Sequence, residues 1–183
     1  MAVGAVSASL AKLPNALTVF RFALIPLFVA LVLAADGSGS WTSAAVFALA
    51  GATDQVDGWL ARRWRVESEF GKFADPLADR LMIDAAVVLL WLDGRLPWAA
   101  LAVIVIRDGA LLLGYGAVRD RGYEFGVNFL GKASTWLLYA SLVGLTASDE
   151  GTAWPLWLFW VALAGALAAA GQYAVTAWRA VKR

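Results

Sequence analysis

The sequence predicts an all-α integral membrane protein with six transmembrane helices and with both termini in the cytoplasm. Of the 183 residues, 61% are hydrophobic, and the mean hydropathy of +0.69 is far above that of a soluble globular domain. Six apolar stretches of about 20 residues, the length that crosses the hydrocarbon core, follow one another along the chain. Lys and Arg gather in alternate connections between these stretches, which predicts a single orientation in the membrane.

The chain divides into a short N-terminal segment and one six-helix domain. Residues 1–13 are small and weakly apolar, and a short interfacial helix is one interpretation of them. Pro14 and Asn15 open the domain, which runs from residue 14 to residue 183. The predicted spans are 16–35, 41–62, 72–92, 98–118, 128–147 and 154–178. They are separated by turns at 36–40, 93–97 and 148–151 and by polar connections at 62–69 and 119–127.

The basic residues predict which side of the membrane each connection faces. The side with both termini receives Lys12, Arg62, Arg63, Arg65, Lys72, Arg119, Arg121, Arg179, Lys182 and Arg183. The connections on the opposite side hold Arg95, Asp36, Asp93, Asp149 and Glu150. By the positive-inside rule, the termini and the connection at 62–69 are cytoplasmic. The excess of Arg over Lys and the abundant alanine suggest a bacterial cytoplasmic membrane.

The absence of two residue types limits the chemistry that the chain can perform. It has no cysteine, which excludes disulfides, and no histidine. Histidine is the commonest general base and a common zinc ligand. Carboxylates are therefore left to do any acid–base or metal-binding work.

Four carboxylates interrupt the second and third spans. Charges at membrane depth are costly, so they indicate function by default. Asp54, Asp57, Gly58 and Ala61 fall at i, i+3, i+4 and i+7, which is one face of one helix.

The other two carboxylates share a face of the next helix. Gly71, Asp75 and Asp79 fall at i, i+4 and i+8. The short connection at 62–69 joins the two helices into a hairpin, so their acidic faces are expected to meet near the cytoplasm. Four carboxylates that converge would repel one another without a cation between them. We therefore expect a divalent metal there, and two ions rather than one.

Written out, these residues form the pattern D-x2-D-G-x2-A-R-x8-G-x3-D-x3-D, from Asp54 to Asp79. The pattern resembles that of the CDP-alcohol phosphatidyltransferase family, and every fixed position matches. Pro14, Asn15 and Arg21 also look like the first helix of that family. The resemblance covers the chain from Pro14 to the C-terminus.

The resemblance implies an enzyme that transfers the phosphatidyl group of CDP-diacylglycerol to an alcohol and releases CMP. It implies Mg²⁺ or Mn²⁺ as cofactor, with two ions held by Asp54, Asp57 and Asp75. Asp79 would be the base that activates the acceptor hydroxyl, and would also contact metal. The family commonly forms homodimers, so we expect a homodimer among membrane lipids and no nucleic-acid partner.

Small residues beside the carboxylates suit a nucleotide. Gly58 and Ala61 leave the acidic face nearly free of side chains, and Arg62 is placed to pair with phosphate. The residues expected to bind the CDP-lipid are Asn15, Asp54, Gly58, Ala61, Arg62 and Gly71.

Two cations indicate an anionic acceptor. Arg107 lies within the fourth span, and Lys132 lies near the start of the fifth. The segments I-R-D at 106–108 and F-L-G-K-A-S-T at 129–135 resemble the cardiolipin synthase branch, which uses phosphatidylglycerol. The alternative is the phosphatidylglycerophosphate synthase branch, which uses glycerol 3-phosphate. Both cations also have a plain structural interpretation: Asp108 neutralises Arg107, and Lys132 reaches to lipid headgroups.

Other interpretations remain open for the carboxylates and glycines. Carboxylates at this spacing commonly lie on a solvated helix surface, and Gly58 and Gly71 serve helix packing in many membrane proteins. Asp84 either pairs with Arg80 four residues earlier or takes part in catalysis. A small transporter is a remote alternative, although transport sites usually collect charges from several helices near the midplane.

Overall fold

The computed structural model describes residues 13–64, 69–119 and 129–181 of the chain, without some side chains near the helix ends. All of the described secondary structure is helical. The six helices are α1 (Leu13–Ala34), α2 (Trp41–Trp64), α3 (Glu69–Leu92), α4 (Trp98–Arg119), α5 (Phe129–Ala147) and α6 (Ala153–Val181).

Each predicted span corresponds to one of these helices. The largest differences are at the starts of α1 and α3, at residues 13 and 69 instead of 16 and 72, and at the end of α6, at residue 181 instead of 178. Helices extend past the apolar stretch because polar residues can continue a helix beyond the hydrocarbon. The interpretation of residues 1–13 as an interfacial segment lies outside the described residues, apart from Leu13.

Two of the described helices are long and apolar enough to cross a membrane, α1 over Leu13–Ala34 and α6 over Ala153–Gln172. The other four carry more charged or polar residues, such as Asp54 and Asp57 in α2. That all six helices span the bilayer, with both termini in the cytoplasm, stays a prediction.

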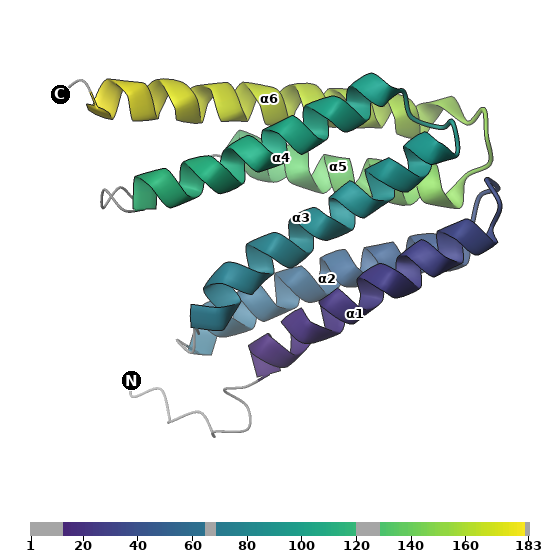
Figure 1. The fold of residues 1–183 in the computed structure, drawn as a ribbon, viewed down its shortest axis with the longest axis horizontal. Helices are drawn as coiled ribbons and strands as arrows, with labels where there is room; N and C mark the ends of the chain where they lie inside the picture. Colours follow the sequence, from purple (N-terminus) through teal and green to yellow (C-terminus); the bar gives the residue numbers. More distant parts are fainter. Residues whose placement is uncertain (1–12, 65–68, 120–128, 182–183) are drawn as a thin grey trace.

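The helices run up and down, so that alternate connections lie at opposite ends of the molecule. The α1–α2, α3–α4 and α5–α6 turns gather at one end, and α1 begins and α6 ends at the other (Figure 1). Helix α1 packs against α2 and α3, α2 packs against α5, and α5 packs against α6. Helix α4 is held mainly by α3. This topology places the end of α2 and the start of α3 at the end of the molecule where α1 begins (Figure 1).

An apolar core joins the described helices. Phe28, Phe47, Met82, Leu138 and Phe159 are fully buried and come from α1, α2, α3, α5 and α6. The ring centroids of Phe28 and Phe47 lie 5.4 Å apart, within the range of favourable aromatic contact. Between membrane helices such packing is stabilised mainly by van der Waals contact. The core therefore fixes how the helices that carry charged residues face one another.

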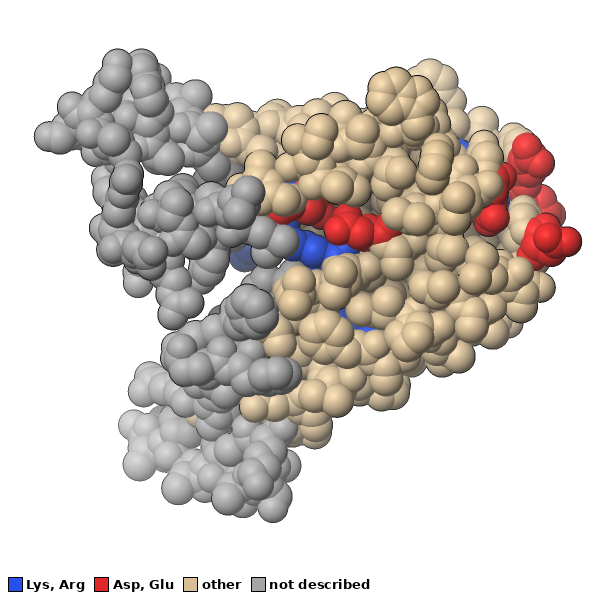
Figure 2. All heavy atoms as spheres, in the orientation of Figure 1, with Lys and Arg blue, Asp and Glu red and all other residues tan. Residues whose placement is uncertain are grey.

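The three tight turns are tied together at the end opposite to the start of α1. The Ser40 N–H donates a 2.8 Å hydrogen bond to the Thr146 oxygen, and the Gly39 N–H donates one of 3.2 Å to Oδ1 of Asp149. Arg95 donates to the backbone oxygen of Ser148. Acidic side chains surround this end of the molecule, as the red atoms at the right of Figure 2 show.

Close packing of α5 on α6 depends on a glycine in α5. At Gly144 a Cβ atom would lie 2.7 Å from Cη2 of Trp154 and 3.1 Å from Cβ of Pro155. Real Cβ atoms do not approach a ring carbon so closely, and a proline next to the ring limits how the ring can move. Gly144 therefore lets the start of α6 lie against the end of α5.

We expect Gly144→Ala to lower the stability of the protein by about 1–3 kcal/mol, the usual effect of overpacking. The measurement is thermal unfolding of the purified protein in detergent. Gly171→Ala is the matched control, because a Cβ at this α6 position has no atom within 4 Å and alanine favours helix. A Gly144→Ala protein as stable as the control would contradict the packing described for α5 and α6.

Candidate active site

A cavity of about 1210 Å³ lies between the helices and is lined by residues of α2, α3, α4, α5 and α6. Its wall includes the four predicted carboxylates, Asp54, Asp57, Asp75 and Asp79. Red and blue atoms appear in a hollow between the upper and lower helices of Figure 2. The acidic faces of α2 and α3 therefore border one space, as the helical spacing predicts.

The other predicted site residues divide into three groups. Gly58, Arg107 and Lys132 line the same cavity as the carboxylates. Asn15 and Gly71 are not among the described residues that line it. The side chains of Ala61 and Arg62 lie outside the part that the structure describes, so their predicted contacts with the CDP-lipid stay predictions.

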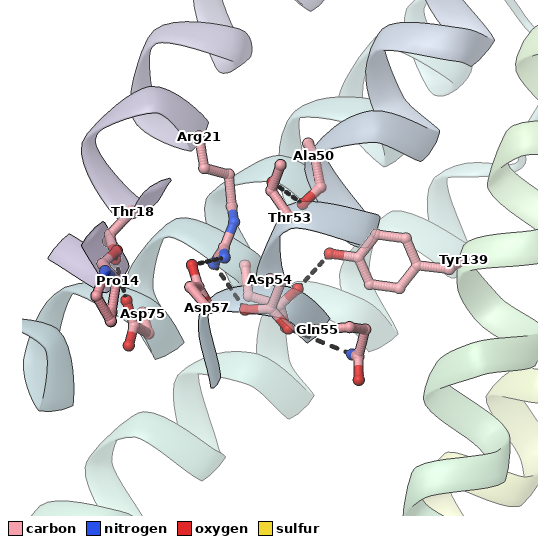
Figure 3. Close-up of polar contacts among 11 residues, drawn as sticks. Pro14, Thr18, Arg21, Ala50, Thr53, Asp54, Gln55, Asp57, Asp75 and Tyr139 are labelled. Carbon is pink, nitrogen blue, oxygen red and sulfur yellow. Dashed lines mark hydrogen bonds and ion pairs between the residues drawn. The ribbon is translucent and has the colours of Figure 1, made fainter. Parts of the chain in front are cut away.

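A buried arginine on α1 pairs with both carboxylates of α2. Arg21 is fully buried. Its Nη1 atom lies 2.7 Å from Oδ1 of Asp54, and its Nη2 atom lies 2.6 Å from Oδ2 of Asp57. In Figure 3, Arg21 reaches from α1 to a position between the two carboxylates. A planar guanidinium suits such a double contact. Arg21 thus provides positive charge that offsets part of the acidic cluster from within the protein.

The two carboxylates of α3 have hydroxyl partners. The Thr18 hydroxyl of α1 lies 2.5 Å from Oδ1 of Asp75. The Tyr139 hydroxyl of α5 donates a hydrogen bond to Oδ1 of Asp79. The ring of Tyr139 lies close to Gly51, where a Cβ atom would come within 2.8 Å of its Cε1 atom. A glycine at position 51 therefore leaves room for the tyrosine that contacts Asp79.

The donor set suits a hard divalent cation, but its present arrangement does not complete a metal site. Four carboxylates border one cavity, and the buried Oδ1 atom of Asp57 has no hydrogen-bond partner among the residues that the structure describes. Mg²⁺ and Mn²⁺ prefer such oxygen ligands. Among the described residues, however, no three carboxylates lie close enough to hold one ion. The expected convergence on one point is not seen. Asp54, Asp57 and Asp75 contact Arg21 and Thr18 of α1, whereas Asp79 contacts Tyr139 of α5.

The charged residues of α3 and α4 form a second polar group. Nη1 of Arg107 lies 3.3 Å from Oδ1 of Asp108, in agreement with the expected neutralisation of Arg107 by its neighbour. Arg80 pairs with Asp108 at 3.3 Å. Asp84, for which pairing with Arg80 was one of two interpretations, has a buried Oδ1 atom with no hydrogen-bond partner in the described part of the chain. Lys132 is exposed at the cavity.

Sequence reasoning gave no role to three residues that the structure brings to the carboxylates, although it did note Arg21 as typical of the first helix. Thr18 and Arg21 lie on the buried stripe of α1 with Leu24 and Phe28. Polar residues on the stripe that an apolar helix buries are the signal that could have identified them. Tyr139 has no comparable signal, because an aromatic residue in an apolar helix is usually part of the core.

Comparison with known proteins agrees with the geometry of this site. The family model for CDP-alcohol phosphatidyltransferase matches residues 11–168. A cardiolipin synthase (CMP-forming) of Streptomyces coelicolor is 40% identical over 147 residues, which are 78% of this chain and 67% of that protein.

Two further relatives are CDP-diacylglycerol–glycerol-3-phosphate 3-phosphatidyltransferases. The protein of Bacillus subtilis is 31% identical over 93% of this chain and 97% of its own length. The protein of Pseudomonas fluorescens is 35% identical over 93% of this chain and 92% of its own length. The match over most of the chain, with the complete aspartate pattern on one cavity, shows that the chain is an enzyme of phospholipid synthesis and belongs to the CDP-alcohol phosphatidyltransferase family.

Proposed function

We propose that this enzyme transfers the phosphatidyl group of CDP-diacylglycerol to phosphatidylglycerol, forming cardiolipin and releasing CMP. The observation that carries the proposal is the composition of the cavity wall. Carboxylates of α2 and α3 line it together with Arg107 of α4 and Lys132 of α5. An acidic region suits a metal-bound pyrophosphate, and cations beside it suit an acceptor that carries its own phosphate.

In the proposed reaction a hydroxyl oxygen of the acceptor attacks the phosphorus that carries diacylglycerol. A new P–O bond forms, the P–O bond to the bridging oxygen breaks, and CMP leaves with that oxygen. Asp79 accepts the proton of the attacking hydroxyl. The hydrogen bond from Tyr139 leaves one of the two carboxylate oxygens of Asp79 to take the proton.

Asp54, Asp57 and Asp75, with Asp79 as a further ligand, are the residues proposed to hold Mg²⁺ or Mn²⁺. The family is generally dependent on divalent metal. A bound cation would offset the negative charge of the pyrophosphate and of the leaving CMP. Since Arg21 now pairs with Asp54 and Asp57, we propose that its side chain gives up part of this contact when metal binds.

The expected setting of the reaction follows from the sequence. We propose that the site opens to the cytoplasm, because the positive-inside rule assigns the basic connections at 62–69 and 119–127 to that side. Gly58 would let the nucleotide lie against α2, with Asn15, Ala61, Arg62 and Gly71 near it. We propose a homodimer in the bacterial cytoplasmic membrane as the working form.

The acceptor is tested by supplying each candidate to the purified enzyme. With CDP-diacylglycerol and Mg²⁺, we expect phosphatidylglycerol to support CMP release with an equal amount of cardiolipin formed. Glycerol 3-phosphate should support less than about a tenth of that rate, a difference of about 1.4 kcal/mol in the transition state. Equal or faster release with glycerol 3-phosphate would favour the phosphatidylglycerophosphate synthase alternative. CMP release with neither acceptor would contradict the proposed transfer.

Asp79→Asn should lower kcat by about 10²–10⁴-fold, because the amide cannot accept the proton of the hydroxyl. Binding of CDP-diacylglycerol, followed by equilibrium titration, should remain measurable. Asp149→Asn is the control, since Asp149 is exposed at the opposite end of the molecule. Turnover near that of the control would exclude Asp79 as the base.

Arg21→Ala should destabilise the metal-free protein by about 3–5 kcal/mol, because it leaves the carboxylates of Asp54 and Asp57 without their counter-charge. Thermal unfolding in the presence of a chelator measures the effect. Arg21→Lys should lose less, since a lysine keeps the charge but cannot pair with both carboxylates through a planar fork. Arg63→Ala, at an exposed position of α2, is the control. An Arg21→Ala protein as stable as this control would show that the double ion pair contributes nothing to the stability of the protein.

A further inference from the structure

A carboxylate on α4 joins two cations that come from different helices. Asp108 is buried, with 3% of its surface exposed. Its Oδ1 atom lies 3.3 Å from Nη1 of Arg80 on α3 and 3.3 Å from Nη1 of Arg107 on α4. Nη1 of Arg80 also donates a 3.1 Å hydrogen bond to the backbone oxygen of Asp108. One residue therefore fixes the two guanidinium groups relative to each other.

Both arginines line the cavity, and both keep donors for a ligand. A guanidinium carries five N–H donors in a planar fork, and the ion pairs to Asp108 use one nitrogen of each group. The Arg80 side chain is 22% exposed. Nε of Arg107 is buried and has no hydrogen-bond partner in the described part of the chain. An anion with several oxygens is the ligand that such a pair of forks recognises best.

Carboxylates offset the charge of the two arginines. Asp108 pairs with both guanidinium groups, and Asp84 and Asp79 of α3 place further negative charge near it. Paired guanidinium groups are less costly to bury than isolated cations. The arginines would therefore select a ligand by the position of their donors, and Lys132, which lines the same cavity, would supply further positive charge.

We infer that Asp108 is a positioning residue, which holds Arg80 and Arg107 as a paired binding site for the phosphate of the acceptor. This inference rests on the proposed function and deepens it, because it adds Arg80 to the acceptor site. Arg80 directly follows Asp79, and both residues line the cavity. In both candidate acceptors one glycerol unit separates the phosphate from the reacting hydroxyl. Holding the phosphate at Arg80 thus brings that hydroxyl toward the proposed base.

The test is a steady-state comparison of wild type and Asp108→Asn with separate titrations of the two substrates. We expect the KM for phosphatidylglycerol to rise by about tenfold, while the KM for CDP-diacylglycerol changes by less than about twofold, because a misplaced pair of donors affects one substrate only. Asp108→Glu, which keeps the charge, should recover part of the acceptor affinity. Asp36→Asn, an exposed carboxylate in the α1–α2 turn, is the control.

A double-mutant cycle that combines Asp108→Asn with Arg107→Gln separates positioning from a general loss of structure. If Asp108 acts through the arginines, the double variant should lose less acceptor affinity than the two single losses combined, because one of the two groups that Asp108 positions is already gone. Equal increases in both KM values, or additive losses in the double variant, would overturn the inference.

Arg80→Gln provides an independent route if Asp108→Asn does not fold. It removes half of the paired site, so it should also raise the KM for the acceptor selectively. An unchanged acceptor KM in an active Arg80→Gln enzyme would overturn the inference while leaving the proposed function intact. The same titrations with glycerol 3-phosphate show which acceptor brings the phosphate. A wild type active with neither acceptor would overturn both proposals.

Discussion

The structure depends on how buried carboxylates are balanced inside an apolar helical bundle. Asp57 is almost fully buried, and an isolated charge in such a place would be strongly destabilising. The double ion pair of Arg21 with Asp54 and Asp57 supplies the balance from α1. Asp108 plays the corresponding role, with the opposite sign, between the cations of α3 and α4. Each group joins two helices that pack against each other, α1 with α2 and α3 with α4.

This arrangement links the packing of the helices to the chemistry of the site. The core of the bundle is apolar and includes Phe28, Phe47 and Leu138. The Tyr139 ring packs against Phe47 with 5.3 Å between ring centroids, and its hydroxyl reaches Asp79. The same side chain therefore belongs to the core and to the candidate active site. Changes in helix packing near Gly51 should consequently alter the position of the Tyr139 hydroxyl and its hydrogen bond to Asp79.

The apolar stretches predicted the helices well, because they are separated by turns at 36–40, 93–97 and 148–151 and by polar connections at 62–69 and 119–127. Helical spacing also placed Asp54, Asp57, Asp75 and Asp79 on faces that border one cavity. Helical spacing could not predict the partners of these carboxylates. Arg21, Thr18 and Tyr139 lie 33 to 60 residues away from them in the chain, from the pair Arg21–Asp54 to the pair Tyr139–Asp79, and their contacts depend on tertiary packing. For the same reason it paired Arg80 with Asp84 on its own helix, whereas Asp108 of α4 is the partner. Nor could it show that the carboxylates stand apart in this arrangement.

We propose that the aspartates of α2 and α3 form one cation-binding centre. When no metal is bound, Arg21 offsets part of the negative charge of this centre. Titration of the purified protein with Mn²⁺, followed by electron paramagnetic resonance, tests this claim most directly. We expect wild-type protein to bind Mn²⁺, and Mg²⁺ to compete for the same site. Asp57→Asn and Asp75→Asn should each abolish or strongly weaken the binding of Mn²⁺. Wild-type protein that binds no Mn²⁺, or variants that bind it as tightly as wild type, would contradict the account.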